Sequence, residues 1–284
     1  MRRGRVPELG IILLGLQLVR NIGVTNIPPV TCLAILGQVG VYLQMLVVPR
    51  LCLSGEGVWV KGEYLRLVVP ALRHTHDIHL YYNMVSLAWK GIQLERRLGS
   101  IRFFFTLVLL TLMSGIAYVL LAVLAADLSE DYSYMQQCSI GFSGVLFALK
   151  VLTSKYSSET DRESYFGFLV PIRYGVWLEL LLIQVLVPNT SFIGHLGGIL
   201  AGLVLVKGPI GGISSIFRSY SMVPFGPGCL LLCLGLVTQY TGYFNGHPLT
   251  GCLPTRDLFY QSWAQPSLQG AKYIILSPLY HLGI

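Results

Sequence analysis

The sequence has 284 residues, of which 54% are hydrophobic and 12% are charged. About a quarter of the residues of an average soluble domain are charged, so this balance argues against a soluble protein and indicates a polytopic membrane protein. The formal net charge is +7, but the lysines and arginines are scattered between apolar runs, which argues against a nucleic-acid-binding surface.

The N-terminal segment, 1–26, has a basic start followed by a short apolar stretch, as a signal peptide does. Arg20 interrupts the apolar stretch, and no clear cleavage site follows. We therefore expect this segment to be retained and to lie in the cytosol, at or near the membrane interface.

Six apolar stretches that suit membrane-spanning helices come next, because one span needs about 20 residues. They cover 28–48, 79–98, 102–126, 139–153, 171–187 and 192–206. The fourth and the sixth are short, which is expected if their beginnings are polar and face a cavity instead of lipid. The sequence therefore predicts an all-α membrane protein with a six-helix bundle over 27–208.

The C-terminal tail, 209–284, mixes Pro, Gly and aromatic residues without periodicity, and we expect most of it to be unstructured. Residues 221–244 are apolar over a stretch that is short for a membrane span. They favour a short membrane-associated helix, with a seventh span as the alternative.

The distribution of basic residues predicts the direction of the helices. Lys and Arg precede the first span, follow the sixth and lie around the second and fourth connections, whereas the third and fifth connections have none. The positive-inside rule then places both termini in the cytosol. The first connection, 49–78, carries basic residues on the opposite side, and we expect it to be a structured loop lying partly in the interface.

The cysteines show no zinc-like pairing beyond one loose CxxxC inside an apolar run. We interpret most of them as small buried apolar residues instead of disulfide partners or metal ligands, and we predict no metal and no cofactor. The six are Cys32, Cys52, Cys138, Cys229, Cys233 and Cys252.

Polar residues gather at one depth of the predicted bundle. The second, fourth and sixth spans all begin on the non-cytosolic side, and there they carry His79 and Asn83, Ser143, and His195. Polar groups at such depth are costly and tend to mark sites that face a water-filled cavity. A serine nucleophile needs a base, and a neutral histidine suits that role. The pattern predicts Ser143 as nucleophile and His195 as base.

The surroundings of the serine suit an oxyanion. Gly141 and Gly144 permit a tight helix start at Ser143, where free backbone N–H groups point at developing negative charge. His79 and Asn83 are four residues apart on one helix face, and both can donate hydrogen bonds to the same oxyanion. The later spans carry no acidic residue at this level, so a dyad is predicted instead of a triad.

Each of these motifs also has a purely structural interpretation. GFSG arises readily by chance in a glycine-rich chain, and an intramembrane histidine can be satisfied by a backbone carbonyl. We interpret Gly198 and Gly202, a GxxxG pattern, as a packing motif that brings the sixth span and His195 against the fourth. The coincidence of four polar side chains at one depth favours chemistry.

Four motifs resemble, in their order, those of the rhomboid family of intramembrane serine proteases. They are HTHDIHLYYNM, ERRLGS, GFSGVLFAL and GHLGGILAG, and the likeness extends over 25–210. Four motifs in the family's order are far more specific than any one of them. TNIPPV and WKGIQLERRLGS resemble in particular the endoplasmic-reticulum members of the family.

The resemblance implies Ser143 as nucleophile and His195 as general base, with an oxyanion hole formed by His79, Asn83 and the Ser143 backbone N–H. It implies an endopeptidase that cleaves transmembrane substrates in or near their spans through an acyl-enzyme, and a role in protein quality control in the endoplasmic reticulum. The tail lacks the acidic, leucine-containing ubiquitin-interacting and AAA-ATPase-binding segments of these members, so neither partner is predicted.

Further positions support or depart from the family pattern. His74 and Glu95 match positions that support the first loop and the cytosolic end of the second span. Phe147 stands where many relatives have a tyrosine stacked on the histidine, Gly194 stands where alanine is common, and the usual Trp-Arg pair is Leu-Arg at 65–66. None of these departures removes a reacting group.

Two other classes compete with a protease. A catalytically silent rhomboid-like protein that binds and escorts membrane clients lacks the serine, the histidine or both, whereas this chain has both. A channel or transporter needs ionisable residues at several depths, whereas the later spans offer one polar layer. The expected partners are transmembrane substrates and the lipid bilayer, without nucleic acid.

Overall fold

The computed structural model of the chain describes residues 9–158, 160–165, 168–187 and 190–207. The candidate helix or span at 221–244 and the rest of the predicted tail lie outside these residues. The six predicted spans all form helices, which confirms the predicted all-α bundle. They are α2 (Pro29–Tyr42), α3 (Asp77–Leu98), α4 (Ser100–Ser129), α6 (Ser143–Tyr156), α7 (Ile172–Leu186) and α8 (Phe192–Lys207).

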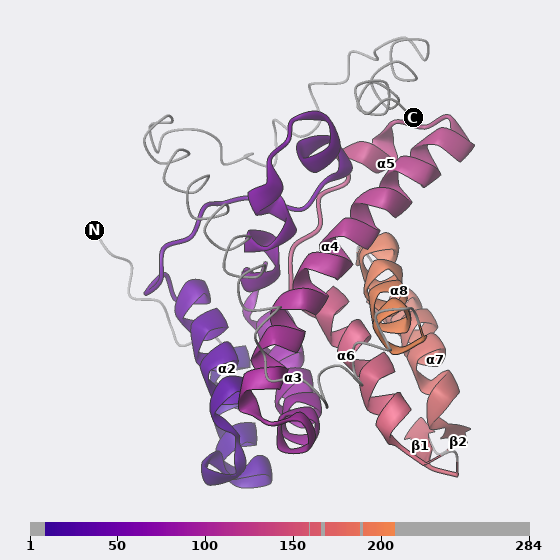
Figure 1. The fold of residues 1–284 in the computed structure, drawn as a ribbon. Coiled ribbons are helices and arrows are strands. Elements are labelled where there is room, and N and C mark those ends of the chain that lie inside the picture. Colours follow the sequence, from indigo (N-terminus) through magenta and orange to yellow (C-terminus); the bar gives the residue numbers. More distant parts are fainter. Residues whose placement is uncertain (1–8, 159, 166–167, 188–189, 208–284) are drawn as a thin grey trace.

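Helix α6 lies at the centre of the bundle and packs against α3, α4, α7 and α8, while α2 packs against α3 and α4 (Figure 1). All of its residues from Val145 to Leu152 are buried. The helix that carries the candidate nucleophile is therefore enclosed by the others.

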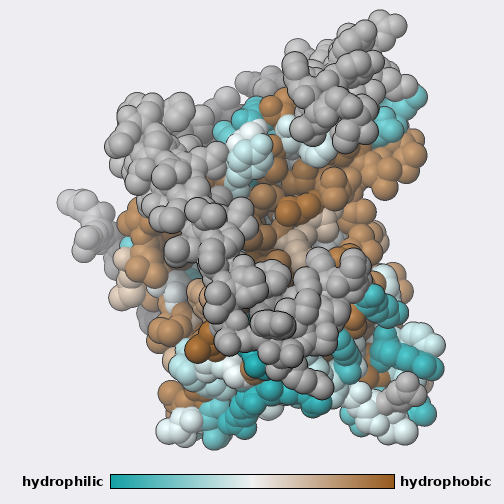
Figure 2. Space-filling view, in the orientation of Figure 1, coloured by the Kyte–Doolittle hydropathy of each residue, from teal (hydrophilic) through white to brown (hydrophobic). Residues whose placement is uncertain are grey.

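The outside of the bundle is apolar between two more polar ends. Large hydrophobic side chains of α4 such as Leu120, Leu124 and Leu128, and Leu181 and Val185 of α7, are exposed. Figure 2 shows hydrophobic side chains over the middle of one face and hydrophilic ones toward the end with the hairpin β1–β2. Contact of these apolar side chains with water is unfavourable, so this surface is suited to contact with lipid.

Among the described helices, α4 alone is long and apolar enough to cross a membrane by the criteria of length and composition. Helices α2 and α8 are apolar but shorter. A helix that begins at a polar pocket inside the protein needs fewer apolar residues than one surrounded by lipid.

Small elements occur at both ends of the bundle. The first connection folds into three short helices, Glu56–Val60, Tyr64–Leu67 and Val69–Leu72, as expected of a structured loop. A short helix, α5 (Ser133–Gln136), follows α4. The antiparallel hairpin of β1 (Arg162–Tyr165) and β2 (Phe168–Pro171), which sequence analysis did not foresee, joins α6 to α7 at the other end (Figure 1).

The N-terminal segment differs from the predicted interfacial placement. Helix α1 (Leu9–Leu16), a π-helical turn (Gln17–Ile22) and a 3₁₀ turn (Val24–Asn26) run along α3 from one end to the other. The Gly10 backbone N–H donates to the Asp77 carboxylate over 2.8 Å, and Arg96 donates to the Asn26 carbonyl over 2.8 Å. The stretch lies along α3 because its apolar side chains, among them Leu14 and Ile22, join the core.

The interpretation of the cysteines is wrong for one pair. Cys52 in the first loop and Cys138 before α6 form a disulfide, with their Cα atoms 5.4 Å apart. Next to it, Leu53 and Ser139 form an antiparallel bridge. These cysteines are 86 residues apart, so no local spacing reveals the pairing. Cys32 is free and partly buried, and the other three cysteines lie outside the described residues.

Glu95 joins α3 to the start of α2. Its carboxylate accepts hydrogen bonds from the backbone N–H groups of Val30 and Thr31, at 2.9 and 2.7 Å, and from the Thr31 hydroxyl at 2.7 Å. The first N–H groups of a helix have no partner within the helix. Glu95 therefore caps α2 across the fold.

Candidate active site

The hydroxyl of Ser143 and the ring of His195 are within hydrogen-bond distance. His195 Nε2 lies 2.9 Å from Ser143 Oγ. Ser143 is the first residue of α6, and His195 lies in the first turn of α8. The structure thus brings together two residues that are 52 positions apart.

Two glycines of α8 allow His195 to lie next to Ser143. A Cβ at Gly198 would stand 1.9 Å from the carbonyl oxygen of Gly144, and one at Gly202 would stand 2.8 Å from that of Ala148. Both distances are far below van der Waals contact, so only glycine permits the two backbones to approach this closely. The predicted GxxxG packing is what delivers His195 to Ser143.

The histidine is enclosed. Its side chain is buried, and its ring packs against the ring of Phe147 with the centroids 4.8 Å apart and the planes tilted by 38°. Its second ring nitrogen, Nδ1, has no hydrogen-bond partner among the described residues. The arrangement is a Ser-His pair without a third, acidic member in the described part of the chain.

Hydrogen-bond donors converge beside the serine. Gly141 has φ +127°, and a Cβ there would lie 2.8 Å from His79 Nε2 and 3.8 Å from Asn83 Nδ2. The Asn83 Nδ2 group is buried and has no partner in the part of the chain that the structure describes. With the first N–H groups of α6, these side chains suit an oxyanion beside Ser143.

The first loop closes this region. The Gly141 backbone N–H donates to the Pro70 carbonyl over 3.0 Å. His74, also in the loop, packs edge-on against His79 with the ring centroids 5.1 Å apart. Burial lowers the pKa of His74 to about 3, and the neighbouring His79 and His76 add to the effect. His74 is therefore neutral at physiological pH and acts as a packing group.

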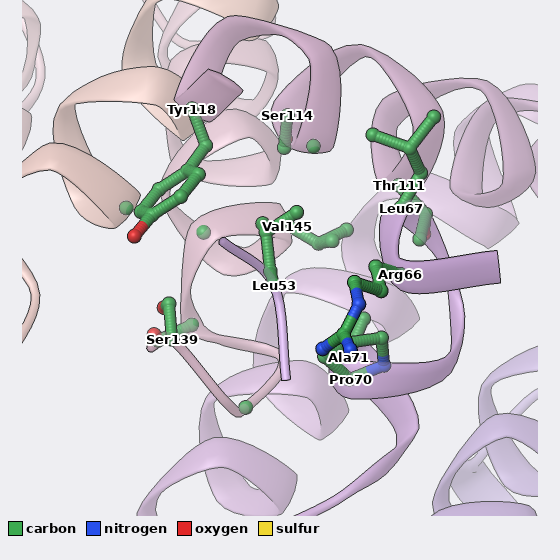
Figure 3. A pocket seen from close by; sticks show the side chains of 15 residues that line it. Leu53, Arg66, Leu67, Pro70, Ala71, Thr111, Ser114, Tyr118, Ser139 and Val145 are labelled. Carbon is green, nitrogen blue, oxygen red and sulfur yellow. The ribbon is translucent and has the colours of Figure 1, made fainter. Parts of the chain in front are cut away.

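A pocket lies next to Ser143, between the first loop and α4 (Figure 3). Its polar lining includes Arg66, Thr111 and Ser114, and Ser114 Oγ is buried without a hydrogen-bond partner in the described residues. Across the described ranges, no group of three or more His, Cys, Asp or Glu side chains is arranged to hold a metal ion. The pocket is a small cavity with both polar and apolar lining residues, which suits a small side chain or water.

Sequence reasoning missed several neighbours of the site. Thr75 contacts the ring of His79, and the Cys52–Cys138 disulfide ties the first loop to the segment before Ser143. Thr75 lies inside the HTHDIHLYYNM motif, but a threonine at that position does not by itself indicate a contact with His79. Cys52 and Cys138 are 86 residues apart, so no motif indicates their pairing.

Comparison with known proteins agrees with the resemblance expected from the motifs. The model of the rhomboid domain matches residues 61–208. Rhomboid-related protein 4 of Homo sapiens is 40% identical over 210 residues, which are 74% of this chain and 66% of that protein. The matched part is thus slightly less than two thirds of the relative's length.

Other relatives carry other names. Rhomboid-like protein 14, mitochondrial, of Arabidopsis thaliana is 40% identical over 190 residues, covering 63% of this chain and 56% of its own. Rhomboid-type serine protease 2 of Emericella nidulans is 27% identical over 146 residues, covering 50% and 26%. One of these relatives is thus named as a serine protease.

Proposed function

The chain belongs to the rhomboid family, and we propose that it is an intramembrane serine endopeptidase. The observation that carries this proposal is the contact between Ser143 Oγ and His195 Nε2, 2.9 Å apart, beside convergent hydrogen-bond donors. The relative named as a rhomboid-type serine protease adds support from the family.

The mechanism follows from this geometry. His195 Nε2 takes the proton of Ser143 as Oγ bonds to the scissile carbonyl carbon, whose oxygen becomes an oxyanion. His79, Asn83 and the Ser143 N–H donate hydrogen bonds to that oxyanion. The C–N bond then breaks, the leaving amine takes the proton from His195, and an acyl-enzyme remains on Ser143. Water, activated by the same histidine, hydrolyses the ester.

The proposed substrates are membrane proteins with one or more spans. In a substrate helix each carbonyl accepts a hydrogen bond inside the i to i−4 ladder, so cleavage requires local unwinding. We expect spans weakened by Gly, Pro or polar residues to be preferred, and small side chains at the cleaved position to fit beside Ser143.

The proposed location is the endoplasmic reticulum, with a role in protein quality control and the active site on the lumenal side. Two observations support this orientation. Arg96 and Arg97 lie at the opposite end of α3 from His79, as the positive-inside rule expects of the cytosolic side. The Cys52–Cys138 disulfide is at the active-site end, and disulfides persist in oxidising compartments such as this lumen. Fluorescence microscopy of the tagged protein tests the compartment, because one relative is named as mitochondrial.

A reconstitution experiment tests the activity. The full chain in liposomes is given a fluorogenic transmembrane substrate, and we expect cleavage that is lost in Ser143→Ala and in His195→Ala. Ser154→Ala is the control, because Ser154 is on the same helix and its hydroxyl donates to the Val151 carbonyl. Cleavage that persists in Ser143→Ala contradicts the proposal.

Chemical labelling locates the nucleophile independently of any substrate. A fluorophosphonate is expected to label the wild type and Ser154→Ala but not Ser143→Ala. A wild-type protein that binds transmembrane helices without cleaving them or reacting with the probe supports the escort alternative.

A further inference from the structure

The ring of His79 is held between two different partners. Its Nδ1 lies 3.1 Å from the hydroxyl of Thr75, in the loop just before α3. Its Nε2 faces the active site, 2.8 Å from the position that a Cβ of Gly141 would take. The two nitrogens of one ring thus point in opposite directions, one to Thr75 and the other to the region beside Ser143.

The proton of a neutral imidazole is on one nitrogen, and the other nitrogen is then an acceptor. His79 can donate to an oxyanion beside Ser143 only if Nε2 carries the proton. Nδ1 must then accept a hydrogen bond. A threonine hydroxyl can supply it, because it rotates to donate.

We propose that Thr75 is a positioning residue that holds His79 in the Nε2–H tautomer and aims this N–H at the oxyanion. The inference rests on the proposed function and names a residue that acts on it through His79. Because Thr75 acts through the ring of His79, we expect its effect on the rate of the chemical step and not on substrate binding.

The other neighbours of the His79 ring do not set its tautomer. His76 Nδ1 accepts a hydrogen bond from the backbone N–H of His79 at 3.1 Å. This bond caps α3 and involves neither ring nitrogen of His79. The ring nitrogens of His74 have no hydrogen-bond partner within the described residues. The Thr75 hydroxyl is therefore the group that bonds to the ring in the part of the chain that the structure describes.

Thr75 is well placed for substitution. Its side chain is exposed, so replacing it by valine keeps the branched shape and removes the hydroxyl without disturbing the core. Serine restores the hydroxyl without the methyl group. Thr106→Val is the matched control, because Thr106 on α4 donates to the Arg102 carbonyl far from the site.

The kinetic test uses the reconstituted full chain. Loss of an oxyanion-hole donor lowers kcat by about 100- to 1,000-fold. Thr75→Val keeps the His79 ring but removes the hydroxyl that holds it in one tautomer. We therefore expect a smaller loss, on the order of 10-fold in kcat with KM unchanged. Thr75→Ser and Thr106→Val should match the wild type. In a His79→Ala background, Thr75→Val should have no further effect, because the group through which it acts is gone.

A second measurement does not depend on proteolysis. NMR of protein labelled with ¹⁵N in its histidine rings, assigned by comparison with His79→Ala, reports which ring nitrogen carries the proton. We expect Nε2–H for His79 in the wild type and in Thr75→Ser, and a mixture of tautomers in Thr75→Val.

Several outcomes overturn the inference. They are unchanged kinetics in Thr75→Val, equal losses in Thr75→Val and Thr75→Ser, an equal loss in the His79→Ala background, or an Nδ1–H tautomer in the wild type. A wild-type protein that cleaves nothing contradicts the proposed function instead, and the NMR result then still decides the role of Thr75.

Discussion

The backbone of Gly198 lies directly against the carbonyl of Gly144, so that a Cβ at 198 would stand 1.9 Å from that oxygen. This approach of α8 to α6 is three residues from His195 and one residue from Ser143. The distance between Ser143 Oγ and His195 Nε2 therefore depends on the contact between two glycine backbones.

Gly198→Ala is expected to abolish most activity. The added methyl group must push α8 away from α6, which separates His195 Nε2 from Ser143 Oγ and overpacks the core at a cost of about 1–3 kcal/mol. We expect at least about a 100-fold loss in kcat and a lower unfolding temperature, measured by cleavage of the transmembrane substrate and by thermal unfolding.

Gly37→Ala is the control for that change. Gly37 lies within α2, and a Cβ at this position would have no neighbouring atom within 4 Å. Activity should therefore be unchanged, and stability should be equal or slightly higher because alanine favours helices. Wild-type activity and stability in Gly198→Ala would show that the helices do not approach as described.

Reduction of the Cys52–Cys138 disulfide is expected to destabilise the active-site end. The bond closes a loop with a separation of 86 residues, and cross-links of this length contribute about 4 kcal/mol by constraining the unfolded chain. The Cys52→Ser/Cys138→Ser variant should therefore unfold at a lower temperature than the wild type.

The number of reactive thiols tests the same bond. After unfolding, the number of cysteines that a maleimide reagent labels should rise on adding reductant by two more per chain in the wild type than in the double variant. Equal labelling of the wild type with and without reductant would mean that the bond does not form.

Phe147→Leu is expected to slow catalysis more than it lowers stability. Leucine keeps much of the volume but removes the ring that packs against His195 with centroids 4.8 Å apart. Aromatic contacts of this kind contribute about 0.5–1.5 kcal/mol beyond area burial, so kcat should fall by about 2- to 10-fold. Phe147→Tyr, which keeps the ring face, is the comparison; equal rates in all three proteins would exclude a positioning role for the ring.

Stability should depend on pH through Glu163. Its carboxylate pairs with the buried ammonium of Lys150 on α6, which also lies 3.7 Å from Glu179 of α7. Burial alone raises the pKa of Glu163, but hydrogen bonds from Lys150 and Tyr165 outweigh it and lower the pKa on balance. A lowered pKa contributes stability that is present above the unfolded value, about 4.3, and is lost as pH falls through the folded value.

Glu163→Gln removes this contribution. We expect lower stability at pH 7, by about 1–3 kcal/mol since Glu179 still faces Lys150, and a weaker dependence of the unfolding temperature on pH below about 5. Thermal unfolding at a series of pH values measures both. Asp127→Asn is the control, because Asp127 is exposed near the end of α4. If the acid dependence of Glu163→Gln were identical to that of the wild type, other groups would cause it.

Much of the fold could be predicted because the membrane restricts the backbone. In lipid every N–H and C=O must be paired within the segment, so long apolar runs form helices. The basic residues in the connections then predicted on which side of the membrane each helix begins. From this alone Ser143, His195, His79 and Asn83 were expected at one depth. The structure places His195 beside Ser143 and places His79 and Asn83 beside Gly141, two residues before that serine.

Other features depended on contacts between distant parts of the chain. The hairpin β1–β2, the cap that Glu95 provides for α2, and the path of residues 9–26 along α3 have no local pattern. An apolar segment with one arginine is compatible with an interface and with a helix groove. The segment lies against α3 because Leu14 and Ile22 pack into the core.

The sequence by itself determined how deep each residue lies, because depth follows from counting residues along helices that must cross the bilayer. The tertiary structure alone decided which residues are neighbours at that depth. Helix packing brought His195 to 2.9 Å from Ser143, and the folded first loop brought Cys52 to Cys138. Such lateral contacts join segments far apart in the chain, and they form only when side chains of all the helices are packed at once.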